Sequence, residues 1–374
     1  MLANKHTIYL TKNHKLDYAE NKPSNVFMFS ENGKALTAKW LKKTIETKDG
    51  LFVIMDHNNA ILNETEQTLS KRNYYIESIN FADMSESVKI NPFDLVSNTS
   101  EIHFMFLSLL CAMWDNNDPD IPAMSNLIDA FASCIFFMFE NQKEKLTLAT
   151  LKKMVYSVRA NCQTPDGPAK LSDAIFAGIK DQDSMPCKYY AQFKKATAER
   201  EDEVAEKVAK VFDMLTESDM QMMSETDDSL ADSLNFKTAI FINTNNETEE
   251  HSAKIMFAML NCFIQKNTPN KNVLYVVDQL TANYAIINLP HWMKESSEYN
   301  VQYIVCCDDL AGFRESIRKE KHFKTIQGAV AASVLVHQLD VDFNTIKYDE
   351  SKLNDITATV IISDKDVNEQ DKLL

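Results

Sequence analysis

The segment that most constrains the fold is Asn272–Gln279, which reads Asn-Val-Leu-Tyr-Val-Val-Asp-Gln. Its five apolar residues, Val273 to Val277, are rich in β-branched and aromatic side chains and end at an acid. Such a run is typical of a fully buried strand of a parallel sheet. An acid just after that strand lies where open α/β sheets bind ligands, and nucleotide-binding enzymes place a magnesium-orienting carboxylate there. The alternative is that Asp278 only begins a turn, so the other parts of such a site must be sought elsewhere.

Predicted strands alternate with helices on both sides of a long helical stretch. The predicted strands are Thr7–Leu10, Asn25–Phe29, Leu51–Met55, Ile76–Phe81, Lys237–Ile242, Val273–Val277, Val301–Cys307, Val330–His337 and Thr357–Ile362. This alternation is typical of βαβ units, that is, of a mostly parallel sheet with helices on both faces. From about 100 to 234 the pattern is helical only. We therefore predict an α/β domain of residues 1–98 and 235–374, interrupted by an all-α insertion domain of residues 99–234.

Three polar segments of the insertion carry separate expectations. Asp115–Asp120 lacks the glycine and terminal glutamate of a calcium loop, so we expect an exposed loop between two helices. Glu203 and Lys207 are four residues apart on a predicted helix, where they are expected to pair on the solvent face. Thr216–Asp232 is predicted to be a solvated acidic linker with a few methionines in the core. The alternative for that segment is a partner-binding surface, because methionine adapts to many shapes.

Charge and cysteine content limit the class of protein. The chain has 39 basic and 54 acidic residues and a net charge of −15. This charge argues against non-specific DNA binding by the surface as a whole, but it does not exclude a local basic channel. The seven cysteines are odd in number and form no Cys-x-x-Cys pair, as is typical of reduced thiols in a cytoplasmic protein. The eight histidines show no ligand spacing, so no metal site is predicted. The longest apolar run, Phe104–Trp114, is too short to span a membrane.

A phosphate-binding loop is expected between a strand and a helix, and the loop after Asn25–Phe29 has that position. Such a loop needs glycines, a lysine for the phosphates and a Ser or Thr for magnesium. The chain instead reads Ser30-Glu-Asn-Gly-Lys-Ala, with one glycine, a repelling Glu31, and Ala35 where the magnesium ligand belongs. After Asp278, Gln279 stands where hydrolases of this class have a second acid, and an amide cannot accept a proton from water.

These substitutions all weaken the same chemistry. We therefore expect a nucleotide-hydrolase architecture without a working site, a pseudo-ATPase with no catalytic residues. Its vestigial nucleotide-binding residues are Ser30, Asn32, Gly33, Lys34, Asp278 and Gln279.

Taken in order, these segments resemble the coupling proteins of type IV secretion and conjugation, ring-forming ATPases of the RecA-like, DNA-pumping class. Asn91–Leu95, Asn-Pro-Phe-Asp-Leu, is similar to the family's Asn-Pro-aromatic/Leu-Asp signature. Leu51–Leu62 resembles the strand that ends in Asp-Pro-Lys-Gly-Glu-Leu, with the acid Asp56 and the last apolar residue kept. Tyr189–Ala196 resembles the family's segment before the long helix of its all-α domain. Where the family has a Gln-Ser/Thr nucleotide sensor, this chain has Cys306–Asp309.

The resemblance implies a RecA-like sheet of the P-loop type and an all-α domain that recognises protein cargo and the relaxosome. We expect a catalytically degenerate, coupling-protein-like component of a bacterial conjugation or type IV secretion system. It would bind machinery proteins through residues 99–234, in the cytoplasm or at the inner face of the membrane through a partner or a missing N-terminal anchor. Two alternatives stay open: a hexameric DNA-translocating motor that still binds ATP and magnesium with Lys34 and Asp278, and a dead regulatory partner of an active coupling ATPase.

Overall fold

The structure is a computed structural model of the 374-residue chain. It describes residues 7–9, 15–17, 25–30, 41–42, 44–95, 99–114, 118–139, 146–225, 237–245, 247–267, 272–278, 289–296, 300–307, 330–338, 346–348 and 356–362.

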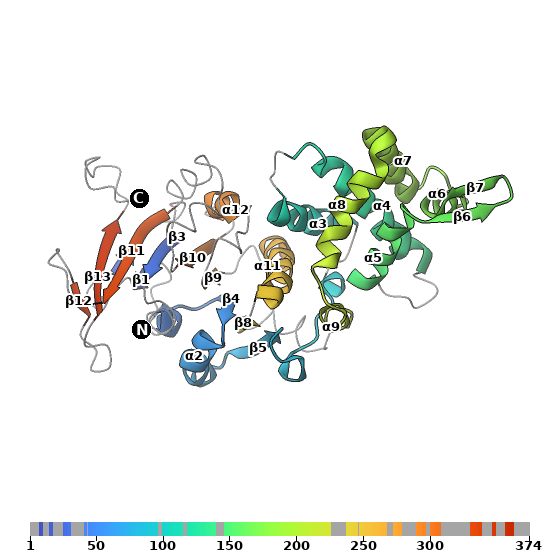
Figure 1. The fold of residues 1–374 in the computed structure, drawn as a ribbon. Helices are drawn as coiled ribbons and strands as arrows, with labels where there is room; N and C mark the ends of the chain where they lie inside the picture. Colours follow the sequence, from blue (N-terminus) through green and yellow to red (C-terminus); the bar gives the residue numbers. More distant parts are fainter. Residues whose placement is uncertain are drawn as a thin grey trace. The chain divides into compact units, whose positions relative to one another are not determined.

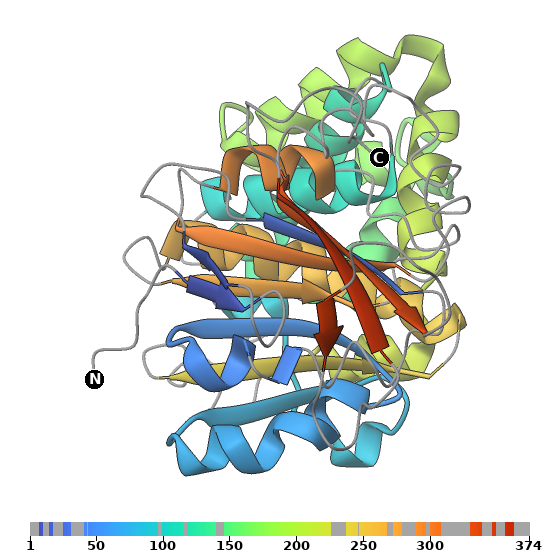
Figure 2. The same cartoon turned by 90° about the vertical axis from the view of Figure 1, so that its left-hand side faces the viewer.

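A nine-stranded sheet forms the centre of the α/β part of the chain (Figures 1 and 2). Its order is β12 (Ile346–Tyr348), β13 (Ile356–Ile362), β11 (Val330–Gln338), β3 (Asn25–Ser30), β10 (Val301–Cys307), β9 (Val273–Val277), β4 (Leu51–His57), β8 (Thr238–Thr244) and β5 (Tyr75–Asn80). All neighbouring pairs from β11 to β5 are parallel, and β13 is antiparallel to both of its neighbours. The predicted mostly parallel sheet is therefore confirmed.

The predicted strands are all present, with ends that differ by at most two residues. The predicted strand Thr7–Leu10 is β1 (Thr7–Tyr9), which pairs with β2 (Lys15–Asp17) in a separate two-stranded sheet. For β9, both the predicted residue range and the predicted central, buried place in the sheet are confirmed. It lies between β10 and β4, with Val273 level with Val301 and Leu51, and all five of its residues are buried.

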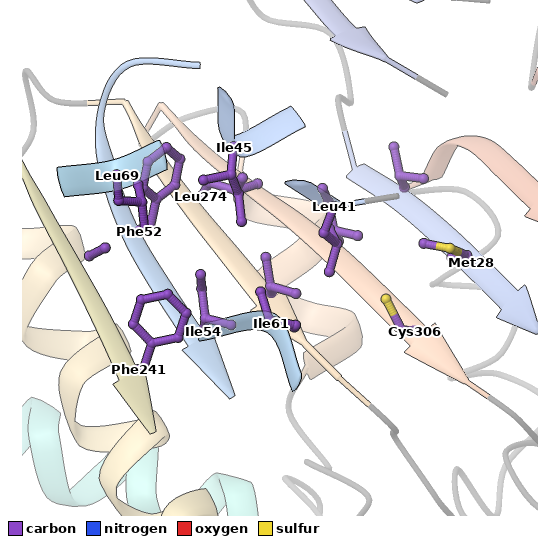
Figure 3. Close-up of a cluster of buried hydrophobic side chains, with 14 of the residues drawn as sticks. Met28, Leu41, Ile45, Phe52, Ile54, Ile61, Leu69, Phe241, Leu274 and Cys306 are labelled. Carbon is purple, nitrogen blue, oxygen red and sulfur yellow. The ribbon is translucent and has the colours of Figure 1, made fainter. Parts of the chain in front are cut away.

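One face of the sheet packs against helices from the N-terminal half (Figure 3). Phe52 and Ile54 of β4 lie in this core with Leu274 of β9. The helical residues 41–42 and 44–47 contribute Leu41 and Ile45, and α2 (Ala60–Lys71) contributes Ile61 and Leu69. The buried residues of α2 are four apart, so a single stripe of this helix covers the sheet.

Gly50 permits the close approach of β4 to the start of β9. Its φ is +153°, and a Cβ at this position would lie 2.2 Å from the carbonyl oxygen of Asn272. The Leu51 amide donates to that same carbonyl at 2.9 Å. A side chain at position 50 would therefore separate the two strands where their pairing begins.

Contacts divide the chain into two compact units. One comprises residues 1–86, 229–253 and 267–374, and the other comprises residues 87–228 and 254–266. The helix α11 (Glu247–Asn267) contributes residues to both units, and α12 (Leu289–Glu295) belongs to the first. None of the helices within the described ranges is both long and apolar enough to cross a membrane.

The second unit is mainly helical but contains a β-hairpin. Its labelled elements between 99 and 222 are α3 (Thr99–Met113), α4 (Ile121–Phe139), α5 (Leu148–Ser157), β6 (Asn161–Thr164), β7 (Gly167–Lys170), α6 (Leu171–Ala177), α7 (Met185–Thr197), α8 (Glu201–Asp213) and α9 (Glu217–Met222). The expectation of helix alone is wrong at the hairpin, where β6 and β7 pair antiparallel with Thr164 opposite Gly167. Gly167 has a φ of +116°, which suits the tight connection between two four-residue strands.

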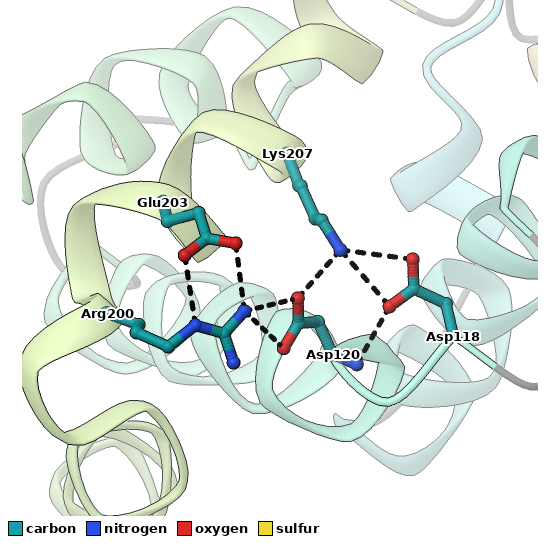
Figure 4. Close-up of polar contacts among 5 residues, drawn as sticks. All are labelled: Asp118, Asp120, Arg200, Glu203 and Lys207. Carbon is teal, nitrogen blue, oxygen red and sulfur yellow. Dashed lines mark hydrogen bonds and ion pairs between the residues drawn. The ribbon is translucent and has the colours of Figure 1, made fainter.

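A network of five charged residues corrects two expectations about the insertion (Figure 4). Asp118 and Asp120 precede α4, and the prediction of an exposed loop is wrong at Asp120, which is buried, whereas residues 115–117 lie outside the described ranges. The Lys207 ammonium lies 3.1 Å from Asp118 Oδ2 and 2.7 Å from Asp120 Oδ2. Arg200 lies 3.0 Å from Asp120 and also pairs with Glu203 at 2.9 Å. Lys207 thus bonds to the acids before α4 rather than to Glu203, because these acids are partly desolvated and offer two carboxylates at once.

The acidic segment after α8 is only partly the linker that its sequence predicts. Thr216 caps α9, since its hydroxyl accepts from the Asp219 amide while the Asp219 carboxylate accepts from the Thr216 amide. Met222 and Met223 are buried, which confirms that methionines of this segment enter the core. The linker prediction is wrong for Glu217–Met222, and residues 226–232 lie outside the described ranges.

Candidate functional site

Four neighbouring parallel strands end at the edge of the sheet where a nucleotide site is predicted. They are β3, β10, β9 and β4, in that order. Because their carboxyl ends meet at one edge, the residues that follow them lie close together. The described part of this edge has three features: the acid after β9, the cysteines of β10 and the acid within β4.

Asp278 follows β9 directly and is 7% exposed. Its backbone amide donates to the Met55 carbonyl of β4 at 3.2 Å. Side chains alternate along a strand, so Asp278 lies on the same face as Leu274 and Val276, which are part of the core in Figure 3. The predicted position of this carboxylate at the carboxyl end of a central buried strand is therefore confirmed.

Cys306 of β10 is the neighbour of Asp278 at this edge. Val277 is level with Val305, so the next residues along the two strands are also level. Burial raises the pKa of the Cys306 thiol well above its ordinary value, and the nearby negative charge of Asp278 raises it further. Cys306 therefore stays a neutral thiol packed in the core.

Asp56 has a structural partner that its sequence position does not reveal. Its Oδ1 accepts from the Ile61 amide at 2.9 Å and its Oδ2 from the Leu62 amide at 2.8 Å. Burial raises the pKa of Asp56 to about 6, against the opposing effect of these amides. The carboxylate thus binds the first turn of α2, whose free amides favour a negative charge.

This contact explains where α2 begins. The helical pattern alone predicts Glu64–Arg72, but α2 begins at Ala60, four residues earlier. Asn58 and Asn59 have φ values of 59° and 55°, a left-handed conformation that asparagine tolerates better than most residues. The two asparagines turn the chain so that Asp56 faces the amides of the helix that follows it.

The structure describes only part of the predicted vestigial site. Ser30 is the last residue of β3, level with Val336 of β11. One strand, β10, separates β3 from β9 and therefore Ser30 from Asp278. Asn32, Gly33, Lys34 and Gln279 lie outside the described ranges, as do Asp308 and Asp309.

The side chains level with Asp278 on β10 and β3 suit a magnesium ion poorly. Magnesium prefers oxygen ligands, and Asp278 supplies a carboxylate. Its neighbour Cys306 and the residue level with Cys306 on β3, Met28, supply sulfur instead, which suits softer metals. Among the described residues, no group of three or more His, Cys, Asp or Glu side chains is placed to hold a metal ion.

A Ser, His and Asp cluster in the helical unit has the composition of a catalytic triad but the wrong connectivity. His103 Nδ1 lies 2.5 Å from Asp129 Oδ2, and the Ser125 hydroxyl lies 3.4 Å from both atoms. In a triad the acid and the serine bond to different ring nitrogens. Here both approach Nδ1, so His103 cannot take the serine proton while it bonds to the aspartate.

Comparison with known proteins identifies the fold. No protein-family model matches the chain, and no curated protein matches it either. Among solved structures, an unbound monoclinic form of the bacterial conjugative coupling protein TrwBdeltaN70 is similar with a TM-score of 0.58 at 11% identity, over 91% of this chain and 78% of that chain. The plasmid coupling protein TrwB in complex with ADP and Mg²⁺ is similar with a TM-score of 0.55 at 13% identity, over 84% of this chain and 70% of that chain.

These similarities extend over most of the chain and confirm the RecA-like architecture with a mostly parallel sheet. This chain therefore has the fold of the conjugative coupling proteins.

Proposed function

We propose that this chain is a catalytically degenerate, coupling-protein-like component of a conjugation or type IV secretion system, and that it acts by binding rather than by turnover. The observation that supports this most directly is the position of Cys306 beside Asp278, at the carboxyl edge of a sheet with the coupling-protein fold. The carboxylate is retained, while a buried neutral thiol lies where a nucleotide sensor would be needed. Ala35 and Gln279 remove two further groups that hydrolysis requires.

The insertion, residues 99–234, is proposed as the surface that binds other proteins of the machinery. Its helices expose several large apolar side chains, including Phe104, Tyr156 and Met214. The protein would work in the bacterial cytoplasm, and at the inner face of the membrane when a membrane partner or anchor holds it there.

A hydrolysis assay tests the degenerate site. The purified chain with ATP and magnesium should release phosphate no faster than buffer, and Lys34→Ala should change nothing. Turnover that depends on ATP and is abolished by Lys34→Ala would refute the proposal.

A second function is supported by the retention of Asp278 at a strand end and of Lys34 in the loop after β3. In this alternative the chain is a motor subunit that binds ATP and magnesium, assembles into hexamers and moves DNA, with missing groups supplied by a neighbouring subunit. It predicts magnesium-dependent ATP binding. Calorimetry that detects no binding at millimolar ATP would eliminate it.

A third function is that of an inactive partner which joins an active coupling ATPase and regulates its ring. Co-purification with an active coupling ATPase from the same cell would separate this role from the first. In that case the partner's rate of hydrolysis should change when this chain is added.

A further inference from the structure

A groove lies between α5 and α9 in the helical unit. It has a volume of about 640 Å³ and is lined by Ala149, Lys152, Lys153, Tyr156, Leu215, Glu217, Met220, Gln221 and Ser224. All of these residues belong to the unit of residues 87–228 and 254–266. The cavity is therefore a feature of that unit alone.

The spacing of the lining residues shows what shape the groove accepts. The wall from α5 consists of positions 149, 152, 153 and 156, and the opposite wall consists of positions 217, 220, 221 and 224. Each set has the spacing i, i+3, i+4 and i+7, so the first wall is one face of α5 and the second follows α9 to Ser224 just beyond its end. Two such ridged walls accept a third helix, because side-chain ridges pack into the grooves between ridges.

The floor and walls of the groove are apolar at their centre. Leu215 is buried at the floor, and Met220 is half-buried on one wall. Tyr156 is 37% exposed on the other wall, with its hydroxyl held by Asp213 at 2.5 Å. A fixed aromatic ring beside an adaptable methionine is typical of surfaces that bind a partner's apolar side chains.

The two rims carry opposite charges. Lys153 is exposed on α5 and Glu217 is exposed on α9, and neither has an ion-pair partner among the described residues. Lys152 differs, because its ammonium already pairs with Asp213 at 3.1 Å. The groove therefore has one basic rim and one acidic rim on either side of an apolar floor.

We propose that this groove binds an amphipathic helix of a partner protein, with an apolar stripe flanked by acidic residues on one side and basic residues on the other. The acidic flank would lie along Lys153 and the basic flank along Glu217. The apolar stripe would cover Tyr156, Leu215 and Met220. This inference rests on the proposed protein-binding role of the insertion and specifies the chemistry of the segment that it binds.

The test uses a synthetic helical peptide with leucines along one stripe, glutamates on one flank and lysines on the other. Its affinity for the full chain is measured by fluorescence anisotropy, and a second peptide with glutamine on both flanks is the control. We expect micromolar binding to the unmodified chain. Met220→Glu should weaken binding at least about tenfold, because it places a charge on the apolar stripe.

Charge reversal makes the test independent of the direction in which the peptide lies. Lys153→Glu gives two acidic rims and Glu217→Lys gives two basic rims, so each variant should weaken binding about three- to fivefold. The double variant K153E/E217K restores opposite rims and should bind within about twofold of the unmodified chain, by the same scale of pair energies. The glutamine-flanked peptide should not distinguish these variants, and Lys180→Glu, an exposed change elsewhere in the unit, should have no effect.

Three results would overturn the proposal: no binding at millimolar peptide, single reversals without effect, or a double variant that fails to recover. Circular dichroism of each variant excludes loss of folding as the cause. The result is separable from the proposed function. ATP turnover would refute that function and leave the groove intact, whereas failed reversals with secretion proteins still bound would refute only the groove.

Discussion

The Asp120 carboxylate accepts a hydrogen bond from the Lys207 ammonium at 2.7 Å, although 87 positions of sequence separate the two residues. Arg200 approaches the same carboxylate at 3.0 Å. The Asp120 side chain is only 7% exposed. These bonds hold the pKa of Asp120 below its usual range, with the Lys207 hydrogen bond as the main cause. They join the beginning of α4 to α8.

Replacement of this acid should destabilise the protein. Asp120→Asn removes a carboxylate that pairs with both Lys207 and Arg200. The free energy of unfolding should therefore fall by about 1–3 kcal/mol at pH 7. The folded pKa is depressed, so the contribution is present above the unfolded pKa of about 3.9 and is lost as the pH falls through the folded value. Urea titrations at several pH values should show the difference between wild type and variant shrink below about pH 4. Glu206→Gln, an exposed change on α8, is the control, and an equal loss there would contradict the assignment.

The capping contact of Asp56 has the opposite pH dependence. Burial raises its pKa to about 6, so the folded protein holds a proton that the unfolded chain releases near pH 4. The stability of the wild type relative to Asp56→Asn should therefore fall by about 1–3 kcal/mol as the pH rises from 4 to 6, and stay level above that. Asp56→Ala removes the cap altogether and should cost about 1–2 kcal/mol relative to Asp56→Asn. A difference between wild type and Asp56→Asn that does not change between pH 4 and 6 would show that the Asp56 pKa is not raised.

Lys254 on α11 should reduce stability at neutral pH. It is 8% exposed, and burial lowers its pKa to about 8. The folded state therefore releases a proton that the unfolded chain keeps until about pH 10.4. Lys254→Met should raise the free energy of unfolding by about 1–3 kcal/mol at pH 7, and this advantage should shrink as the pH rises from 8 to 10. Lys210→Met, on the exposed face of α8, should change stability by no more than about 0.5 kcal/mol.

Alkylation should distinguish the buried cysteines of β10 from Cys162 of the hairpin in the helical unit. Cys306 and Cys307 are each 3% exposed, and the raised pKa of Cys306 keeps its thiol protonated. Cys162 on β6 is half-buried. With iodoacetamide at pH 8, mass spectrometry should detect rapid labelling of Cys162 and labelling of Cys306 only after denaturation. Fast labelling of native Cys306 would mean that the edge beside Asp278 is open to solvent.

Local patterns predict the sheet well because each strand is an apolar run with polar ends. Val273–Val277 is such a run, and its central place follows from burial on both faces. The position of Asp278 follows from the same run, because the acid marks where the strand ends. The register of β9 against β4 is not visible in this way, because it depends on the close contact between Gly50 and Asn272.

Interactions between distant residues could not be predicted from local spacing. Glu203 and Lys207 have ideal helical spacing, yet Lys207 bonds to Asp118 and Asp120, which lie far away in sequence. From the sequence, Asp56 resembles the acid that follows a strand in the coupling proteins. Its hydrogen bonds to the start of α2 are visible only in the structure. In that case the following Asn58 and Asn59 were a signal, since adjacent asparagines tolerate the left-handed turn that brings a helix back to the acid.

Because α11 is divided between the two units, the helical unit cannot be deleted or transplanted as one segment. Residues 247–253 belong with the sheet and residues 254–266 with the helical unit, so one uninterrupted helix crosses the boundary. Excising residues 87–228 would leave a stretch of buried helix, including Ile255 and Phe257, without the unit to which it belongs. The helical unit is therefore not one continuous segment of the sequence, and it cannot be exchanged as a single insert. A transplant between relatives would have to carry half of α11 as well.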